Sequence, residues 1–93
     1  MKTITIQIGN SDDKLTQAEW ASFVRTMRSS ILDSAHTVHF FGAPMNWENW
    51  QNAAWVIAIE EDRIPILKQE IIKVRQEFKQ DSVAWTEGET LFV

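Results

Sequence analysis

The sequence predicts a single α+β domain in which two amphipathic helices pack on one face of an antiparallel sheet. Two segments repeat apolar residues at helical spacing, several others alternate apolar and polar residues as half-buried strands do, and turn-forming residues separate them. The 93 residues, of which 44% are hydrophobic and 24% charged, have the length and composition of one soluble globular domain over residues 1–93.

The first strand is expected over residues 2–8, where three isoleucines at alternate positions share one face. The first helix begins at a capping box, because Thr16 and Glu19 have the S/T-x-x-E spacing in which each side chain binds a free backbone N–H. Its buried stripe repeats at intervals of three and four residues: Trp20, Phe23, Val24, Met27 and Ile31. We expect the helix to end near Leu32 or Asp33.

The second strand is expected over residues 36–41 and the third over residues 52–59. Strict alternation along the second strand places Val38 and Phe40 on one face and Phe41 on the other. The third strand is almost continuously apolar, which is typical of a central strand covered on both faces.

The second helix is expected to begin between Asp62 and Ile64, because Pro65 is tolerated in the first turn of a helix but not in its interior. Its apolar stripe consists of Ile64, Leu67, Ile71, Val74 and Phe78. Two short strands, residues 82–86 and 89–93, are then expected to form a hairpin around a glycine.

The resulting order, β-α-β-β-α-β with a C-terminal β extension, resembles the ferredoxin-like plan. The chain is also similar in length and order to the dimeric α+β barrel proteins, whose haem-degrading members use an asparagine, a tryptophan and a helical histidine. Asn10 and Trp55 match two of these residue types, but the second helix here has no histidine. Acylphosphatases share the order too, yet the loop at residues 9–13 lacks their arginine and is acidic. Because many functions use this fold, the order alone predicts none of them.

Composition argues against several classes of function. Without cysteine, the chain has no disulfide, no thiol nucleophile and no thiolate metal site. A net charge of −4 disfavours nonspecific binding to nucleic acid, which needs a basic surface. The first residues alternate instead of forming a leader's apolar run, and the longest apolar run, residues 53–59, is too short to cross a bilayer. We therefore expect a cytoplasmic protein with no cofactor and no membrane contact.

Polar residues cluster in the loop between the first strand and the first helix. Asn10, Asp12 and Asp13 offer an amide and two carboxylates, which are oxygen ligands of the kind that divalent cations bind. Their spacing is not that of a calcium loop, and turns favour the same residue types. We therefore expect a polar turn without a metal, with a binding role for these side chains as the alternative.

His39 is a candidate general base, because the unperturbed pKa of histidine is about 6.5. His36 and His39 are three residues apart and point to opposite faces of a strand, so a metal shared between them is not expected. No serine or cysteine nucleophile is linked to His39 by a motif.

Trp47, Trp50 and Asn52 lie in or beside the loop before the third strand. An indole buries a large ring while donating one hydrogen bond, and an asparagine both donates and accepts. The chain has five Trp and no Tyr, so this segment predicts either a recognition surface or a loop that seals one end of the core.

The sequence as a whole favours a small non-enzymatic binding protein that acts by protein–protein contact, as an inhibitor or regulator. Its contact surface would be a free sheet face or the loop with Trp47 and Trp50, and a homodimer through the sheet would cover the second apolar face of the third strand. Two alternatives remain. One is a small-ligand or nucleotide-binding domain that uses the same tryptophans and Asn52, and the other is a dimeric-barrel enzyme with His39 as base.

Overall fold

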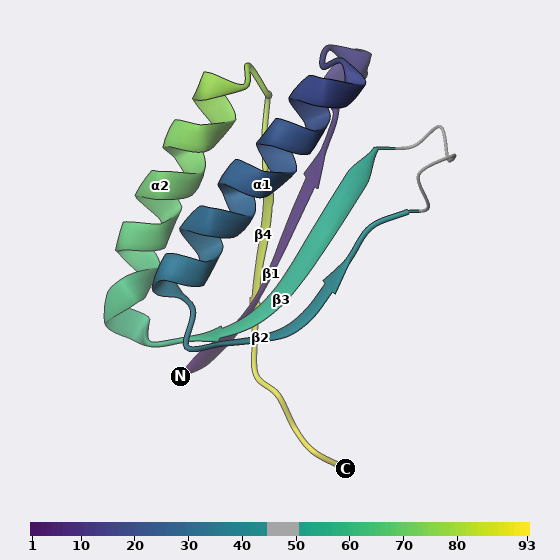
Figure 1. Cartoon of the computed structure of the whole chain (residues 1–93). Helices are drawn as coiled ribbons and strands as arrows, with labels where there is room; N and C mark the ends of the chain where they lie inside the picture. The colour runs from purple at the N-terminus through teal and green to yellow at the C-terminus, as the bar shows by residue number, and fades with distance from the viewer. Residues whose placement is uncertain (45–50) are drawn as a thin grey trace.

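The chain forms a four-stranded antiparallel sheet with two helices side by side on one of its faces (Figure 1). The structure, a computed structural model, describes residues 1–44 and 51–93. Its main elements are β1 (Lys2–Gly9), α1 (Gln17–Ser34), β2 (Thr37–Gly42), β3 (Asn52–Ile59), α2 (Ile64–Glu77) and β4 (Ala84–Gly88). Short 3-10 helices η1 (Ser11–Asp13) and η2 (Glu61–Arg63) precede the two α-helices. The predicted α+β class and ferredoxin-like order are confirmed.

The strand order β2-β3-β1-β4 places β1 and β3 at the centre of the sheet. Ile6 of β1 lies opposite Trp55 of β3 and Trp85 of β4, and residues directly opposite one another share a face. These three side chains point toward the helices, where Ile6 and Trp55 are buried. The register therefore divides every strand into a helix side and an open side.

The core lies between the helices and the sheet. The α1 stripe places Phe23, Met27 and Ile31 there without solvent exposure, and the Phe23 ring centroid lies 5.1 Å from that of Phe78 at the end of α2. The helix begins as predicted, because the Thr16 side chain accepts from the backbone N–H of Glu19 and the Glu19 carboxylate accepts from that of Thr16. No helix in the described residues is both long and apolar enough to span a bilayer.

Alternation along β2 is interrupted by a β-bulge between Val38 and Phe40. Phe40 lies opposite Val56 on the open side, whereas Phe41 packs on Trp55 on the helix side, with ring centroids 5.1 Å apart. The prediction that Val38 and Phe40 share a face is therefore wrong. One extra residue in a strand reverses the face of every side chain that follows it.

The hairpin predicted for the C-terminal residues is not formed. β4 continues along β1 as far as Gly88, which lies opposite Thr3, and no glycine in the described chain has a positive φ. Residues 89–93 lie outside any strand and are all exposed. Figure 1 shows this segment leaving the body of the molecule. The glycine therefore extends the strand instead of turning it.

Candidate functional site

Among the residues that the structure describes, none packs on the face of the sheet that is turned away from the helices. We call it the open face. Its side chains come from all four strands: Thr3, Thr5, Gln7, Thr37, Phe40, Asn52, Ala54, Val56, Ala58, Ala84 and Thr86. None of these residues is Asp, Glu, Lys or Arg, although 24% of the chain is. About half of them are polar but uncharged, and most of the apolar ones lie on β3, with Phe40 beside them on β2. An uncharged face with an apolar centre is typical of a surface that another protein covers.

Phe40 is the exposed aromatic residue of the open face. Its side chain is 56% exposed, while its neighbour Val56 on the central strand is half-buried. The ring lies over Gly42, where an added Cβ would come within 2.5 Å of a ring atom. Because Gly42 has no side chain, the Phe40 ring can lie against the strand. The ring then extends the apolar surface that Val56 begins at the centre of the face.

His39 lies at the bulge of β2 and is exposed. The bulge lies between Val38, which pairs with Ile57, and Phe40, which pairs with Val56, and so faces the middle of β3. His39 is therefore far along the sheet from the end that carries Asn10 and Asn52. Its role as a base remains a prediction.

The amide of Asn10 is used to build the loop that carries it. Its Oδ1 accepts from the backbone N–H of Leu15 at 2.9 Å, and its Nδ2 donates to the carbonyl oxygen of Leu15 at 2.9 Å and to Oε1 of Gln51. Asp12 and Asp13 are exposed and have left-handed backbone φ angles of 53° and 54°. In the described part of the chain, no three His, Asp or Glu side chains converge as a metal site requires. The loop thus has the form of the expected polar turn.

Asn52 is brought to the same end of the sheet as this loop. It is exposed at the start of β3, opposite Gly9, and the backbone N–H of Asn10 donates to the carbonyl oxygen of Gln51 at 3.1 Å. Trp47 and Trp50 lie outside the described residues. Of the predicted site residues, the fold therefore brings together Asn10, its two aspartates and Asn52, and keeps His39 apart.

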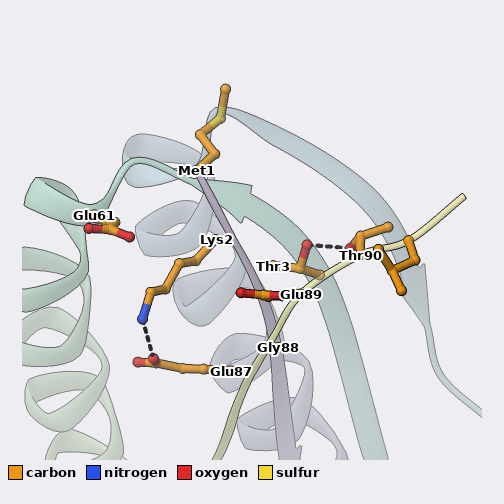
Figure 2. A pocket seen from close by; sticks show the side chains of 9 residues that line it. Met1, Lys2, Thr3, Glu61, Glu87, Gly88, Glu89 and Thr90 are labelled. Atoms are coloured by element: carbon orange, nitrogen blue, oxygen red, sulfur yellow. Dashed lines mark hydrogen bonds and ion pairs between the residues drawn. The ribbon is translucent and has the colours of Figure 1, made fainter.

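A pocket of about 620 Å³ lies where β1 starts and β4 ends (Figure 2). Glu61, Glu87 and Glu89 make it acidic, with Lys2 as its basic residue. Lys2 Nζ lies 3.3 Å from Oε2 of Glu87, as Figure 2 shows. This ion pair offsets one of the three carboxylates, so the pocket keeps a net negative charge.

Glu87 is the carboxylate whose titration this geometry changes. The hydrogen bond from Trp85 Nε1 at 3.1 Å, followed by the hydrogen bond from Lys2, holds the pKa of Glu87 below its usual range. Lys68 adds a cation 3.7 Å from the carboxylate and lies 5.1 Å from the centre of the Trp85 ring. These contacts fasten the edge strand β4 to β1 and α2.

Trp55 carries an unpaired polar atom in the core. Its side chain is 1% exposed, and its Nε1–H has no acceptor among the described residues. A buried donor without a partner usually costs about 1–3 kcal/mol. The indole ring packs beside Phe41, which is 46% exposed.

The sequence pointed to tryptophans, polar loop residues and a histidine, but, apart from Asn52, not to the side chains that form the open face. The signal available was the third strand, which is apolar at nearly every position although the described residues cover one of its faces only. Without the register, Thr5, Val56 and Phe40 could not be recognised as neighbours.

No known family model matches the chain, and no curated protein matches it in sequence. Solved structures do match in fold. A dimeric ferredoxin-like protein of unknown function from Thermobifida fusca has 11% identity and a TM-score of 0.65, over 97% of this chain and 92% of that one.

Two further structures match at similar length. An Arabidopsis thaliana protein has 9% identity and a TM-score of 0.66, with 98% and 97% of the two chains covered. A dimeric protein of unknown function with a ferredoxin-like fold, from Bacteroides fragilis, has 14% identity and a TM-score of 0.57, with 96% of each chain covered. At these identities the likeness shows the fold, and the fold of this chain is ferredoxin-like.

Proposed function

We propose that this protein acts by protein–protein contact and that its first partner is a second copy of itself, bound through the open face. The observation that carries the proposal is the composition of that face. Eleven side chains from four strands contribute no acidic or basic group in a chain with 22 charged residues, 9 basic and 13 acidic. Covering such a face releases water from apolar surface without desolvating any charge.

A second copy fits this face better than a charged partner does. A neutral face meets its own copy without like-charge repulsion, and a two-fold axis pairs a patch with itself. Two of the similar structures, those from Thermobifida fusca and Bacteroides fragilis, are described as dimeric. The dimer leaves the helices outside, where their charged surfaces are free to contact a further protein that the dimer regulates or inhibits.

Sedimentation across a range of concentrations tests the proposal. We expect the wild type to sediment as a dimer and Val56→Glu to sediment as a monomer, because the variant places a charge at the centre of the interface. Ile66→Glu is the matched control. Ile66 lies on α2 and is 51% exposed, so this variant should remain dimeric.

Phe40→Ser is a second variant for the case in which Val56→Glu does not fold, which circular dichroism would reveal. Phe40 is 56% exposed, so the fold does not depend on its burial. A wild type that is monomeric at every concentration would contradict the proposal. So would folded open-face variants that dimerise as tightly as the Ile66 control.

A second candidate function, binding of a small ligand, is supported by Trp55. Its buried Nε1–H, without an acceptor in the described residues, would donate to an oxygen of an apolar ligand that enters beside Phe41. A compound library screened by thermal shift should then contain ligands that raise the midpoint of the wild type but not of Trp55→Phe, which lacks the donor. Equal shifts in both proteins would exclude Trp55 as the ligand's donor.

A further inference from the structure

The segment that follows β4 carries three consecutive apolar side chains in water. Leu91 is 82% exposed and Phe92 95% exposed, and Val93 is also fully open to solvent. Residues 91–93, which we call the arm, lie outside any strand, and Figure 1 shows the segment projecting from the sheet. Apolar residues in this state contribute nothing to the stability of a single chain and are typical of a contact surface.

The base of the arm is held at the rim of the open face. The hydroxyl oxygens of Thr3 and Thr90 lie 2.6 Å apart. Figure 2 marks this hydrogen bond with a dashed line. Thr3 belongs to the open face, because it lies opposite Ala58 of β3 and Gly88 of β4. The arm therefore starts on the side of the sheet that the proposed dimer covers, and not on the side of the helices.

Residues 91–93 can reach a second sheet that lies on the open face. Three extended residues span about 10 Å, and two sheets packed face to face are also about 10 Å apart. Residues 91–93 are thus long enough to reach a sheet lying on the open face. We propose that the arm of each copy packs on the sheet of the other copy and closes the rim of the homodimer. This inference rests on the proposed function.

The double variant Leu91→Ser, Phe92→Ser tests the arm. Burying a Leu or Phe side chain on association contributes favourable free energy of binding. Its loss should raise the dissociation constant of the dimer, measured by sedimentation, at least about tenfold. Ile66→Ser, which removes an apolar side chain that is 51% exposed on α2, is the matched control and should leave the constant unchanged.

A label reports where the arm lies. Because the chain has no cysteine, Phe92→Cys can carry one polarity-sensitive fluorophore, with Ile66→Cys as the control. We expect the emission at position 92 to shift to the blue as dimers form, and that at position 66 to stay constant. A wild type that stays monomeric overturns both the proposed function and the arm. A dimer whose constant does not change in the double variant, or whose label at position 92 does not shift, overturns the arm alone.

Discussion

Gln80 shows how one buried polar side chain joins distant parts of this small domain. It is 3% exposed, its Oε1 accepts from the backbone N–H of Ser11 at 2.8 Å, and its Nε2 donates to the carbonyl oxygen of Phe78 at 3.2 Å. Its backbone N–H donates to the carbonyl oxygen of Arg75 and closes the C-terminus of α2. The loop at the end of β1 is thus held to the end of α2.

Replacement of Gln80 should therefore destabilise the fold. Gln80→Ala leaves the N–H of Ser11 without its acceptor in a part-buried site, so we expect the free energy of unfolding to fall by about 1–3 kcal/mol. Urea denaturation at a fixed protein concentration measures the change. Gln76→Ala on the exposed side of α2 is the control, and an equal effect of the two substitutions would contradict the role given to Gln80.

The lowered pKa of Glu87 predicts that the stability of the fold depends on pH. Its pKa is lowered in the folded chain, first by the hydrogen bond from Trp85 and then by that from Lys2. Its contribution is therefore present at neutral pH and is lost as the pH falls through the lowered pKa, where the folded carboxylate takes up a proton. We expect Glu87→Gln to lower the urea midpoint at neutral pH and to match the wild type in acid. A difference that is the same at both pH values would exclude this linkage.

These two residues also show which side-chain roles the sequence conceals. The Thr16 capping box could be predicted because its partners are three residues apart in one helix. Gln80 and Ser11 are separated by 69 positions. From the sequence alone, a glutamine that follows a helix is expected in a turn exposed to solvent. Asn10 was correctly placed in a turn, but its hydrogen bond to Gln51 depends on the pairing of β1 with β3.

At the scale of elements, the helices and central strands followed from periodicity, while β2 did not. β3 occupies the predicted residues 52–59, and both helices bury the predicted stripes. The bulge in β2 has no sequence signature, because the two adjacent phenylalanines fit either face of a strand. The face of Phe40 is consequently a property of the register with β3, and only the structure revealed it.

Because of the bulge, replacing Phe40 and replacing Phe41 should have different effects on the free energy of unfolding. Phe41 packs on Trp55, so Phe41→Ala should lower the free energy of unfolding by about 1–2 kcal/mol, less than for a fully buried ring because it is 46% exposed. Phe40→Ala should change it by less than about 0.5 kcal/mol. Both values are to be measured by urea denaturation at concentrations where the chain is monomeric. Reversed effects would mean that β2 alternates without the bulge.

At the scale of the whole molecule, the open face decides what the stable unit is. In the described ranges, 1–44 and 51–93, the helices cover one sheet face, and the second side of β3, with Ala54, Val56 and Ala58, is half-buried. The sequence indicated this imbalance through the apolar third strand. It could not identify which face was open, because that depends on the side of the sheet on which both helices pack.

If the dimer is the stable unit, unfolding must depend on protein concentration. Each chain gains stability from association by mass action, so the thermal midpoint of the wild type should rise by roughly 3–6 °C for every tenfold increase in concentration above the dissociation constant. Differential scanning calorimetry over two decades of concentration measures the slope. Val56→Glu should give a constant midpoint, and Ile66→Glu, altered on the exposed side of α2, should retain the wild-type slope. A wild-type midpoint that does not vary with concentration would mean that the open face stays in water and that the single chain is the folding unit.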